Sequence, residues 1–355
     1  MSSRERKGSR PTHPSAPRSG DAPRAATRRS DDAERLLDAA LARRAALRRA
    51  GHAGAWRLVH GAADGLAGFV LEQFGDVLIA QVHEGVCELS PEQLRDLAER
   101  ARRATGARSV YRKRFPRDRS AALRALESEH TDPQPWLGAA APAEFAVHEH
   151  DARFLIRPYD GYSVGLFLEQ RANRGRVREQ SRGRRVLNTF AYTCGFSVAA
   201  ALGGARAVAS VDVSKKYLEW GKRNFAANEL ALDGARFYCC DVLDFYERAA
   251  RQGQRFDLVI LDPPTFGRSR QSGRAFALRA DIDPLVRGAV RLLDPGGALF
   301  LSTNLRKLSH EALLQSVAAA ARAEGRRVGA TERPELPADF AGDADYARTL
   351  IARIE

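Results

Sequence analysis

The segment that decides the fold is Phe256-Asp257-Leu258-Val259-Ile260-Leu261-Asp262-Pro263-Pro264-Thr265-Phe266. Its apolar first half is typical of a buried strand, and its second half supplies a carboxylate, two prolines and an aromatic ring. Proline fixes φ and cannot donate to a sheet ladder, so the two prolines end the strand rigidly. Ligands of open α/β sheets bind at this carboxyl edge of the strands. We therefore expect Asp262 and Phe266 to lie at a binding site, with a plain strand-ending turn as the alternative.

Two strands upstream of this segment also end in polar residues. The apolar stretch 185–190 leads into a loop with a single glycine, Gly195, and then into a helix of small residues. One glycine does not match the G-x-G-x-x-G pyrophosphate fingerprint, which argues against a dinucleotide. The next strand, 207–211, is followed by Asp212, 24 positions after Asn188. A carboxylate at that distance commonly accepts hydrogen bonds from two ribose hydroxyls, and a helix N-cap is the alternative.

The rest of the C-terminal half continues to alternate strands with helices. A helix is expected over 214–228 and a third strand over 235–240, followed by Asp241 and Val242. This pair could bind an adenine amino group and cover its ring, and a solvated turn is the alternative for Asp241. The remaining elements are helices over 243–252 and 283–293 and a strand over 298–302. Strands that alternate with helices imply a parallel sheet with right-handed crossovers.

Five motifs between residues 159 and 302 are similar to those of one enzyme family. They are Phe167-Leu168-Glu169-Gln170-Arg171, Phe190-Ala191-Tyr192-Thr193-Cys194-Gly195-Phe196, Ser210-Val211-Asp212-Val213-Ser214, Arg223-Asn224 with Asn228, and Asp262-Pro263-Pro264-Thr265-Phe266. Together they resemble the class I S-adenosylmethionine-dependent methyltransferases. More narrowly, they resemble the bacterial large-subunit rRNA methyltransferases that modify guanine N7 or cytosine C5. One departure is Cys194, where the family usually has a second glycine.

The resemblance implies a Rossmann-like domain, a mostly parallel sheet with helices on both faces, and S-adenosylmethionine as cofactor. It implies that Asp262 and Pro263 bind a planar base through the carboxylate and the prolyl carbonyl, and that Phe266 stacks on the base. The cofactor-binding residues it implies are Gln170, Arg171, Asn188, Phe190, Tyr192, Thr193, Gly195, Asp212, Ser214, Asn228, Asp241 and Val242.

The chain before the catalytic domain predicts a smaller α+β domain over 31–140, which is similar to the domain that precedes the catalytic one in this family. Within it we expect one helix between 31 and 51 and another over 91–105, strands over 56–60, 68–73, 77–83 and 109–115, and a polar linker around 132–138. The methyltransferase domain then covers 141–355, beginning with a hairpin of strands 143–148 and 152–157.

The charge of the chain agrees with an RNA substrate. The net charge is +13 and the pI about 10.1, and phosphate neutralisation by Lys and Arg dominates affinity for nucleic acid. Residues 1–30 hold eight Lys or Arg against two acidic residues, and therefore supply +6 of this charge. Their lack of large apolar residues predicts a disordered basic tail, which is either a nucleic-acid arm or a solvated segment without specific function.

Candidate RNA contacts lie in two places. The stretch Tyr111-Arg112-Lys113-Arg114 interleaves cations with an aromatic ring, as contact with RNA phosphates and bases would require. The alternative is an ordinary basic strand with Tyr111, Lys113 and Phe115 on one face. Asn304 and Arg306, after the fifth strand, could fix the base or its backbone. The partner implied is 23S rRNA or a precursor ribosomal particle.

The four cysteines bear on the chemistry. Their spacing suggests neither a zinc site nor a disulfide framework, and no metal is implied. Cytosine C5 becomes nucleophilic only after a thiolate adds at C6, yet the strand tips at 262–265 and 302–304 hold no Cys. This absence favours attack by a base nitrogen, with guanine N7 preferred over an exocyclic amine.

Other functions stay open. They are a cytosine C5 enzyme, a methyltransferase for a non-RNA substrate, and a non-catalytic RNA-binding assembly factor. The sequence has no secretory h-region and no transmembrane run, so the cytoplasm is the expected location.

Overall fold

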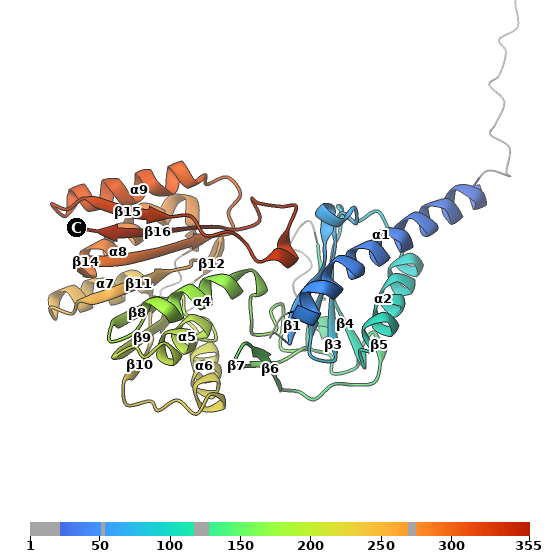
Figure 1. Cartoon of the computed structure of the whole chain (residues 1–355), viewed down its shortest axis with the longest axis horizontal. Helices are drawn as coiled ribbons and strands as arrows, with labels where there is room; N and C mark the ends of the chain where they lie inside the picture. Colours follow the sequence, from blue (N-terminus) through green and yellow to red (C-terminus); the bar gives the residue numbers. More distant parts are fainter. Residues whose placement is uncertain (1–21, 51–53, 117–127, 269–274) are drawn as a thin grey trace, which may run out of the picture.

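A computed structural model describes residues 22–50, 54–116, 128–268 and 275–355. The chain forms two α/β units, each built on its own sheet (Figure 1). Among the described residues, no helix is long and apolar enough to cross a bilayer.

The N-terminal unit contains a five-stranded sheet in the order β1-β2-β3-β4-β5. Its helix α2 (Pro91–Thr105) begins at a capping box of Ser90 and Gln93 and ends at Gly106, which adopts φ 69°. These local signals fixed α2 at the predicted residues. The strands are β1 (Ala55–His60), β2 (Phe69–Phe74), β3 (Val77–His83), β4 (Ser109–Phe115) and β5 (Leu137–Gly138). The two-residue β5 was predicted as linker, and it pairs with the start of β4.

Helix α1 (Ala22–Ala50) lies against this unit and contacts β1 and α2 (Figure 1). Its first residues, from Ala22, overlap the stretch 1–30 that the sequence predicts to be a disordered tail. Ala and Arg favour helix, and Pro23 is tolerated in a first turn. The rest of the predicted tail, residues 1–21, lies outside the described residues.

A hairpin connects the two units. Its strands, β6 (Phe145–Glu149) and β7 (Ala152–Ile156), confirm the predicted hairpin with slightly shorter strands. The hairpin packs on the C-terminal unit, where β7 contacts α5 (Gly195–Leu202) and α6 (Lys215–Ala227).

The C-terminal unit contains a seven-stranded sheet in the order β10-β9-β8-β11-β14-β16-β15. The pairs among β10, β9, β8, β11 and β14 are parallel, whereas β16 is antiparallel to both of its neighbours. The strands are β8 (Arg185–Thr189), β9 (Ala207–Asp212), β10 (Ala235–Cys239), β11 (Phe256–Leu261), β14 (Leu293–Thr303), β15 (Val328–Glu332) and β16 (Arg348–Ile354). The predicted Rossmann-like, mostly parallel sheet is confirmed. The final antiparallel pair was not predicted.

Helices cover both faces of this sheet. Successive apolar side chains of β11 point to opposite faces, so both faces must be buried. Leu258 and Ile260 pack with residues of α4 (Arg171–Gln180) and α5. Val259 and Leu261 face the opposite layer. That layer consists of α7 (Val242–Arg251), α8 (Leu278–Leu292) and α9 (His310–Ala323). Helix α8 begins five residues before the predicted 283 and continues through Pro284.

The strand order locates the place where a ligand should bind. From β8 the chain proceeds outward to β9 and β10, then returns to place β11 on the other side of β8. This reversal is a topological switch point, and ligands of open α/β sheets bind in the crevice outside the carboxyl ends of the strands there. The loop after β8 and the Asp-Pro-Pro segment after β11 both lie at that edge.

Candidate active site and cofactor site

The loop after β8 has an unusual backbone. Phe190, Tyr192 and Cys194 all adopt positive φ, at 53°, 49° and 62°. Each such non-glycine residue costs about 1–3 kcal/mol and persists only where its surroundings determine it. Here the Ala191 N–H donates to the Val211 carbonyl at 2.9 Å, and the Thr193 hydroxyl donates to the Gly165 carbonyl at 2.6 Å. Strain of this kind, held by neighbouring strands and loops, is typical of ligand-binding segments.

Asp212 lies at the end of β9 and faces this loop. One carboxylate oxygen accepts the N–H of Tyr192 at 2.9 Å, and the other accepts the N–H of Ser214 at 2.8 Å. The N-cap of α6 is Ser214, whose hydroxyl accepts from Tyr217 N–H, so Asp212 does not have the alternative capping role. Burial raises the pKa of Asp212, against the opposing effect of these two hydrogen bonds. Each oxygen retains acceptor capacity for a ligand hydroxyl.

Asp241 has a helix-capping role that was not among the predictions for it, and it is half-buried where the alternative was a solvated turn. It is the N-cap of α7 and accepts the N–H of Leu243 at 2.9 Å through one carboxylate oxygen. Only one of the two carboxylate oxygens makes this hydrogen bond. Val242 is buried beside it, as a residue covering a ring would be.

Asp262 lies at the tip of β11, half-buried between the ends of β8 and β14. The side-chain amide of Gln170 lies 3.5 Å from its carboxylate and donates to Ser302 Oγ at 2.9 Å. Asn173 in turn donates to the Gln170 carbonyl oxygen at 2.7 Å and to Thr349 Oγ1 at 2.9 Å. This network fixes the amide that faces the carboxylate. Burial raises the pKa of Asp262 to about 6, so the group is mainly ionised at neutral pH.

The two strand tips beside Asp262 are tied together. Thr265 donates from its hydroxyl to Asn304 Oδ1 at 2.6 Å, which links the end of β11 to the end of β14. Pro263 is buried, whereas Asn304 is exposed. Phe266 begins β12 (Phe266–Arg268), which pairs with β13 (Ala275–Ala277), and its side chain lies outside the described part of the chain.

The family model for S-adenosylmethionine-dependent methyltransferases matches residues 88–354. The chain belongs to this family. Its cofactor is S-adenosylmethionine, and the predicted enzyme class is confirmed.

Named relatives agree with this assignment. A protein of Deinococcus radiodurans named ribosomal RNA large subunit methyltransferase is 35% identical over 327 residues, which cover 90% of this chain and 78% of that protein. The ribosomal RNA large subunit methyltransferase I of Cronobacter sakazakii is 32% identical, over 84% of this chain and 73% of that protein. A solved S-adenosylmethionine-dependent methyltransferase from Streptococcus mutans has the same fold. It has a TM-score of 0.76 and 24% identity, and the match covers 91% of this chain and 81% of that one.

Arg171 of this methyltransferase is held by contacts with other parts of the protein. Its guanidinium donates to Asp339 at 2.9 and 3.2 Å and to the Ala55 carbonyl at 2.7 Å, and it lies 4.6 Å from the centre of the Trp56 ring. Arg171 therefore joins the two units, because Ala55 and Trp56 belong to β1. These contacts give Arg171 a structural role, and its predicted contact with the cofactor stays a prediction.

Two asparagines of the predicted cofactor set are also occupied by the protein. Asn188 is buried and donates to Ser197 Oγ at 2.8 Å, which ties β8 to α5. Asn228 accepts the Arg153 N–H and donates to the Arg153 carbonyl, both at 2.7 Å. Asn228 thus fixes the hairpin strand β7 to the end of α6, and its predicted contact with the cofactor stays a prediction.

This placement of Asn228 gives a prediction. Asn228→Ala should lower the free energy of unfolding by about 1–2 kcal/mol, the range for lost hydrogen bonds, and should leave the dissociation constant for S-adenosylmethionine within twofold. Urea denaturation and titration calorimetry measure the two quantities. A tenfold loss of cofactor affinity in a variant of normal stability would instead support the predicted contact with the cofactor.

The predicted RNA-contacting stretch is only partly exposed. Lys113 is buried and donates from Nζ to the carbonyls of His130 at 2.9 Å and Gly161 at 2.6 Å, and burial lowers its pKa to about 8. Tyr111 is buried and donates from its hydroxyl to the Pro133 carbonyl. Neither side chain can contact RNA in this structure, so the alternative of a basic strand with a buried face is correct for both.

The two arginines of that stretch remain at the surface. Arg112 and Arg114 both donate to Glu129, at 2.8 and 2.7 Å. Arg306, from the other predicted group, forms an ion pair with Asp343 and is exposed. All three are engaged with acids of the protein itself.

Two residues were missed as parts of the site. Phe167 is 44% exposed, and its ring centre lies 5.3 Å from that of Tyr192; it begins the motif that carries Gln170. Gly221 provides the space for Cys194, because a Cβ at this position would lie 2.3 Å from the Cys194 sulfur. The Cys194 side chain, which stands where the family usually has glycine, therefore fits because α6 has a glycine opposite it. The sequence signal for this contact was Gly221 within a predicted helix.

Proposed function

We propose that this methyltransferase transfers a methyl group to a base nitrogen of large-subunit rRNA, with guanine N7 as the favoured atom. The observation that carries the proposal is a half-buried carboxylate, Asp262, at the switch point, with no thiol at the neighbouring strand tips. The names of the relatives support rRNA as the substrate.

The positions of the cysteines support chemistry without a covalent enzyme–base adduct. Cys239 ends β10 and Cys240 follows it. Strand β10 lies three strands away from β11, or about 14 Å at 4.7–4.9 Å per strand. Cys194 is nearer, but it is fully buried, and burial raises its pKa to about 12. A thiol with that pKa is almost entirely protonated at neutral pH and is therefore a poor nucleophile.

The remaining groups suit binding and alignment. Bound S-adenosylmethionine supplies an electrophilic sulfonium methyl group. Asp212 offers acceptor capacity for the ribose hydroxyls, and the ionised Asp262 accepts hydrogen bonds from the Watson–Crick edge of the base. Guanine N7 carries an in-plane lone pair and has no proton to lose, so alignment and exclusion of water provide most of the rate. An exocyclic amine would use the same acceptor.

Mass mapping of rRNA nucleosides tests the proposal. In a strain without this protein, one methylated purine nucleoside should disappear from 23S rRNA, and the purified enzyme should restore it in the unmodified rRNA. Loss of 5-methylcytidine would identify a C5 enzyme. Unchanged rRNA together with undiminished cofactor binding would indicate a non-RNA substrate.

The absence of a thiol at the site gives a further prediction. The double change Cys239→Ser and Cys240→Ser should leave kcat within twofold, because neither side chain reaches the base held by Asp262. RNA that carries 5-fluorocytosine should form no covalent complex with the wild-type enzyme on a denaturing gel. A trapped adduct, or loss of turnover in the double variant, would overturn the nitrogen assignment.

A further inference from the structure

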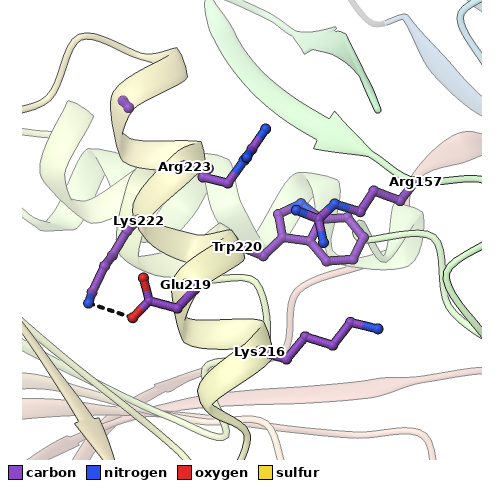
Figure 2. Close-up of a pocket in the computed structure, with 7 residues that line it drawn as sticks. Arg157, Lys216, Glu219, Trp220, Lys222 and Arg223 are labelled. Carbon is purple, nitrogen blue, oxygen red and sulfur yellow. Dashed lines mark hydrogen bonds and ion pairs between the residues drawn. The ribbon is translucent and has the colours of Figure 1, made fainter. Parts of the chain in front are cut away.

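A basic groove runs along the outer face of α6, on the side toward the end of β7 (Figure 2). Four cationic side chains line this groove, which has a volume of about 510 Å³. They are Arg157, Lys216, Lys222 and Arg223, and one acid, Glu219, lines the groove with them and pairs with Lys222. None of them belongs to the candidate catalytic or cofactor-binding residues.

Two less exposed acids pair with the other three cations. Asp160 pairs with Arg157 and with Lys216, and Glu144 pairs with Arg157 and with Arg223. The acidic side chains are 25% and 18% exposed, whereas those of Lys216 and Arg223 are 54% and 59% exposed. The acids therefore orient these cations, of which Lys216 and Arg223 face the solvent.

The floor of the groove is rigid and closed. Trp220 is buried and donates from its ring N–H to the Leu155 carbonyl at 3.1 Å, and the guanidinium of Arg157 lies 4.3 Å from the centre of its ring. Gly165 leaves the space for this ring, since a Cβ there would lie 2.3 Å from it. A buried tryptophan cannot stack on a base, so the groove presents cations without a surface that could read sequence.

The groove begins close to the cofactor edge of the sheet. Lys216 precedes Tyr217, whose ring centre lies 4.5 Å from that of Tyr192, and the Tyr192 N–H binds Asp212. From Lys216 to Arg223 the helix rises about 10 Å, at 1.5 Å per residue. A polyanion that enters the active site can continue along this line of cations.

We propose that this groove binds backbone phosphates of the RNA next to the target nucleotide. The inference rests on the proposed function, because it assumes that RNA is the substrate. Contacts to phosphates fix the position of a nucleic acid without reading its sequence. The groove should therefore increase affinity for any RNA and leave the choice of nucleotide to the site around Asp262.

The test compares two double charge reversals. K216E/R223E alters the groove, and R287E/R291E makes the same change in net charge on α8, where each arginine is also exposed and paired with one acid. Binding of an unmodified large-subunit rRNA transcript is measured by fluorescence anisotropy between 50 and 200 mM KCl. The groove variant should bind at least tenfold more weakly at 100 mM. The slope of log K against log salt should become shallower by about 1–2, at 0.7–0.9 per lost phosphate contact.

Kinetics and a second polyanion complete the experiment. The groove variant should show a raised KM for RNA, an unchanged kcat at saturating RNA, and wild-type affinity for S-adenosylmethionine. Equal weakening by both double variants would overturn the groove as a specific contact. So would a defect of K216E/R223E with poly-glutamate but not with RNA, which would indicate an acidic protein partner. If the wild-type enzyme methylates no RNA, the proposed function is wrong. If it methylates RNA and the groove variant binds RNA as tightly as the wild type, only the proposed role of the groove is wrong.

Discussion

Asp262→Asn is expected to lower kcat by about 10²–10³, a loss typical of removing one preorganised polar group that acts in the transition state. Asn has nearly the same size, so the Gln170 and Ser302 contacts around it can persist. Asn replaces the anionic carboxylate with an amide, whose oxygen is a neutral acceptor and whose NH₂ group is a donor. The base edge would then face a donor where it needs an acceptor. The dissociation constant for S-adenosylmethionine should change by less than threefold, because the loss is in alignment of the base.

The same substitution should stabilise the folded protein at neutral pH. The pKa of Asp262 is raised from 3.8 to about 6 by burial. Its contribution to stability is therefore fully present below pH 4 and is lost as the pH rises through 6. At pH 7.5 Asp262→Asn should increase the free energy of unfolding by about 1–3 kcal/mol, at 1.36 kcal/mol per pKa unit. This gain should disappear as the pH is lowered toward 4 in thermal denaturation.

The matched control is Asp257→Asn, at the opposite end of the same strand. Asp257 accepts the Arg185 N–H at 2.7 Å and lies at the amino edge of the sheet, away from the ligand edge. Its variant should keep kcat within threefold. If Asp262→Asn retains wild-type turnover on the rRNA transcript, the proposed role of Asp262 is wrong.

Asp212→Ala is expected to weaken binding of S-adenosylmethionine about 10–150-fold, which corresponds to the 1.5–3 kcal/mol of hydrogen bonds to a charged group. The side chain offers acceptors to the ribose and also holds the N–H groups of Tyr192 and Ser214. The left-handed backbone at Tyr192 should therefore relax in the variant. Titration calorimetry measures the affinity, and NAD should give no heat with either protein.

Asp257→Ala is the control that separates a loss of affinity for S-adenosylmethionine from a general loss of stability. Both aspartates lie on strands of the same sheet and accept a backbone N–H from a neighbouring segment. Both variants should therefore lose stability, and only Asp212→Ala should lose cofactor affinity. Equal cofactor affinity in the two variants would remove Asp212 from the cofactor site.

Local signals explain where the sequence predicted structure accurately. The bounds of β3, α2, β4 and β11 agree with the prediction because turn residues, caps and prolines fix these ends within a few positions. Asp212 and Asp262 were located in the same way, since each directly follows an apolar strand in a parallel sheet. The edge on which such residues meet follows from the alternation of strands and helices alone.

Other predictions depended on which face of a strand or helix is buried in the folded protein. The pattern at 111–114 fits a strand with either face exposed, and only the contacts of Lys113 with the His130 and Gly161 carbonyls show that its face is buried. Arg171 lies next to Gln170 in the motif, yet it turns toward Asp339 and β1. Adjacent positions in a chain often serve different partners.

Short apolar runs and the residues that end them were enough to predict the parallel sheet, the carboxylates at its edge and the enzyme family. The folded structure was needed to find the antiparallel β15–β16 pair, the burial of Lys113 and the contacts that Arg171 and Asn228 make with other segments. It also brought Arg157, which follows β7, beside Lys216 and Arg223 of α6 in one groove. The physical reason is that strand ends are set by neighbouring residues, whereas burial and charge pairing are set by residues distant in the chain.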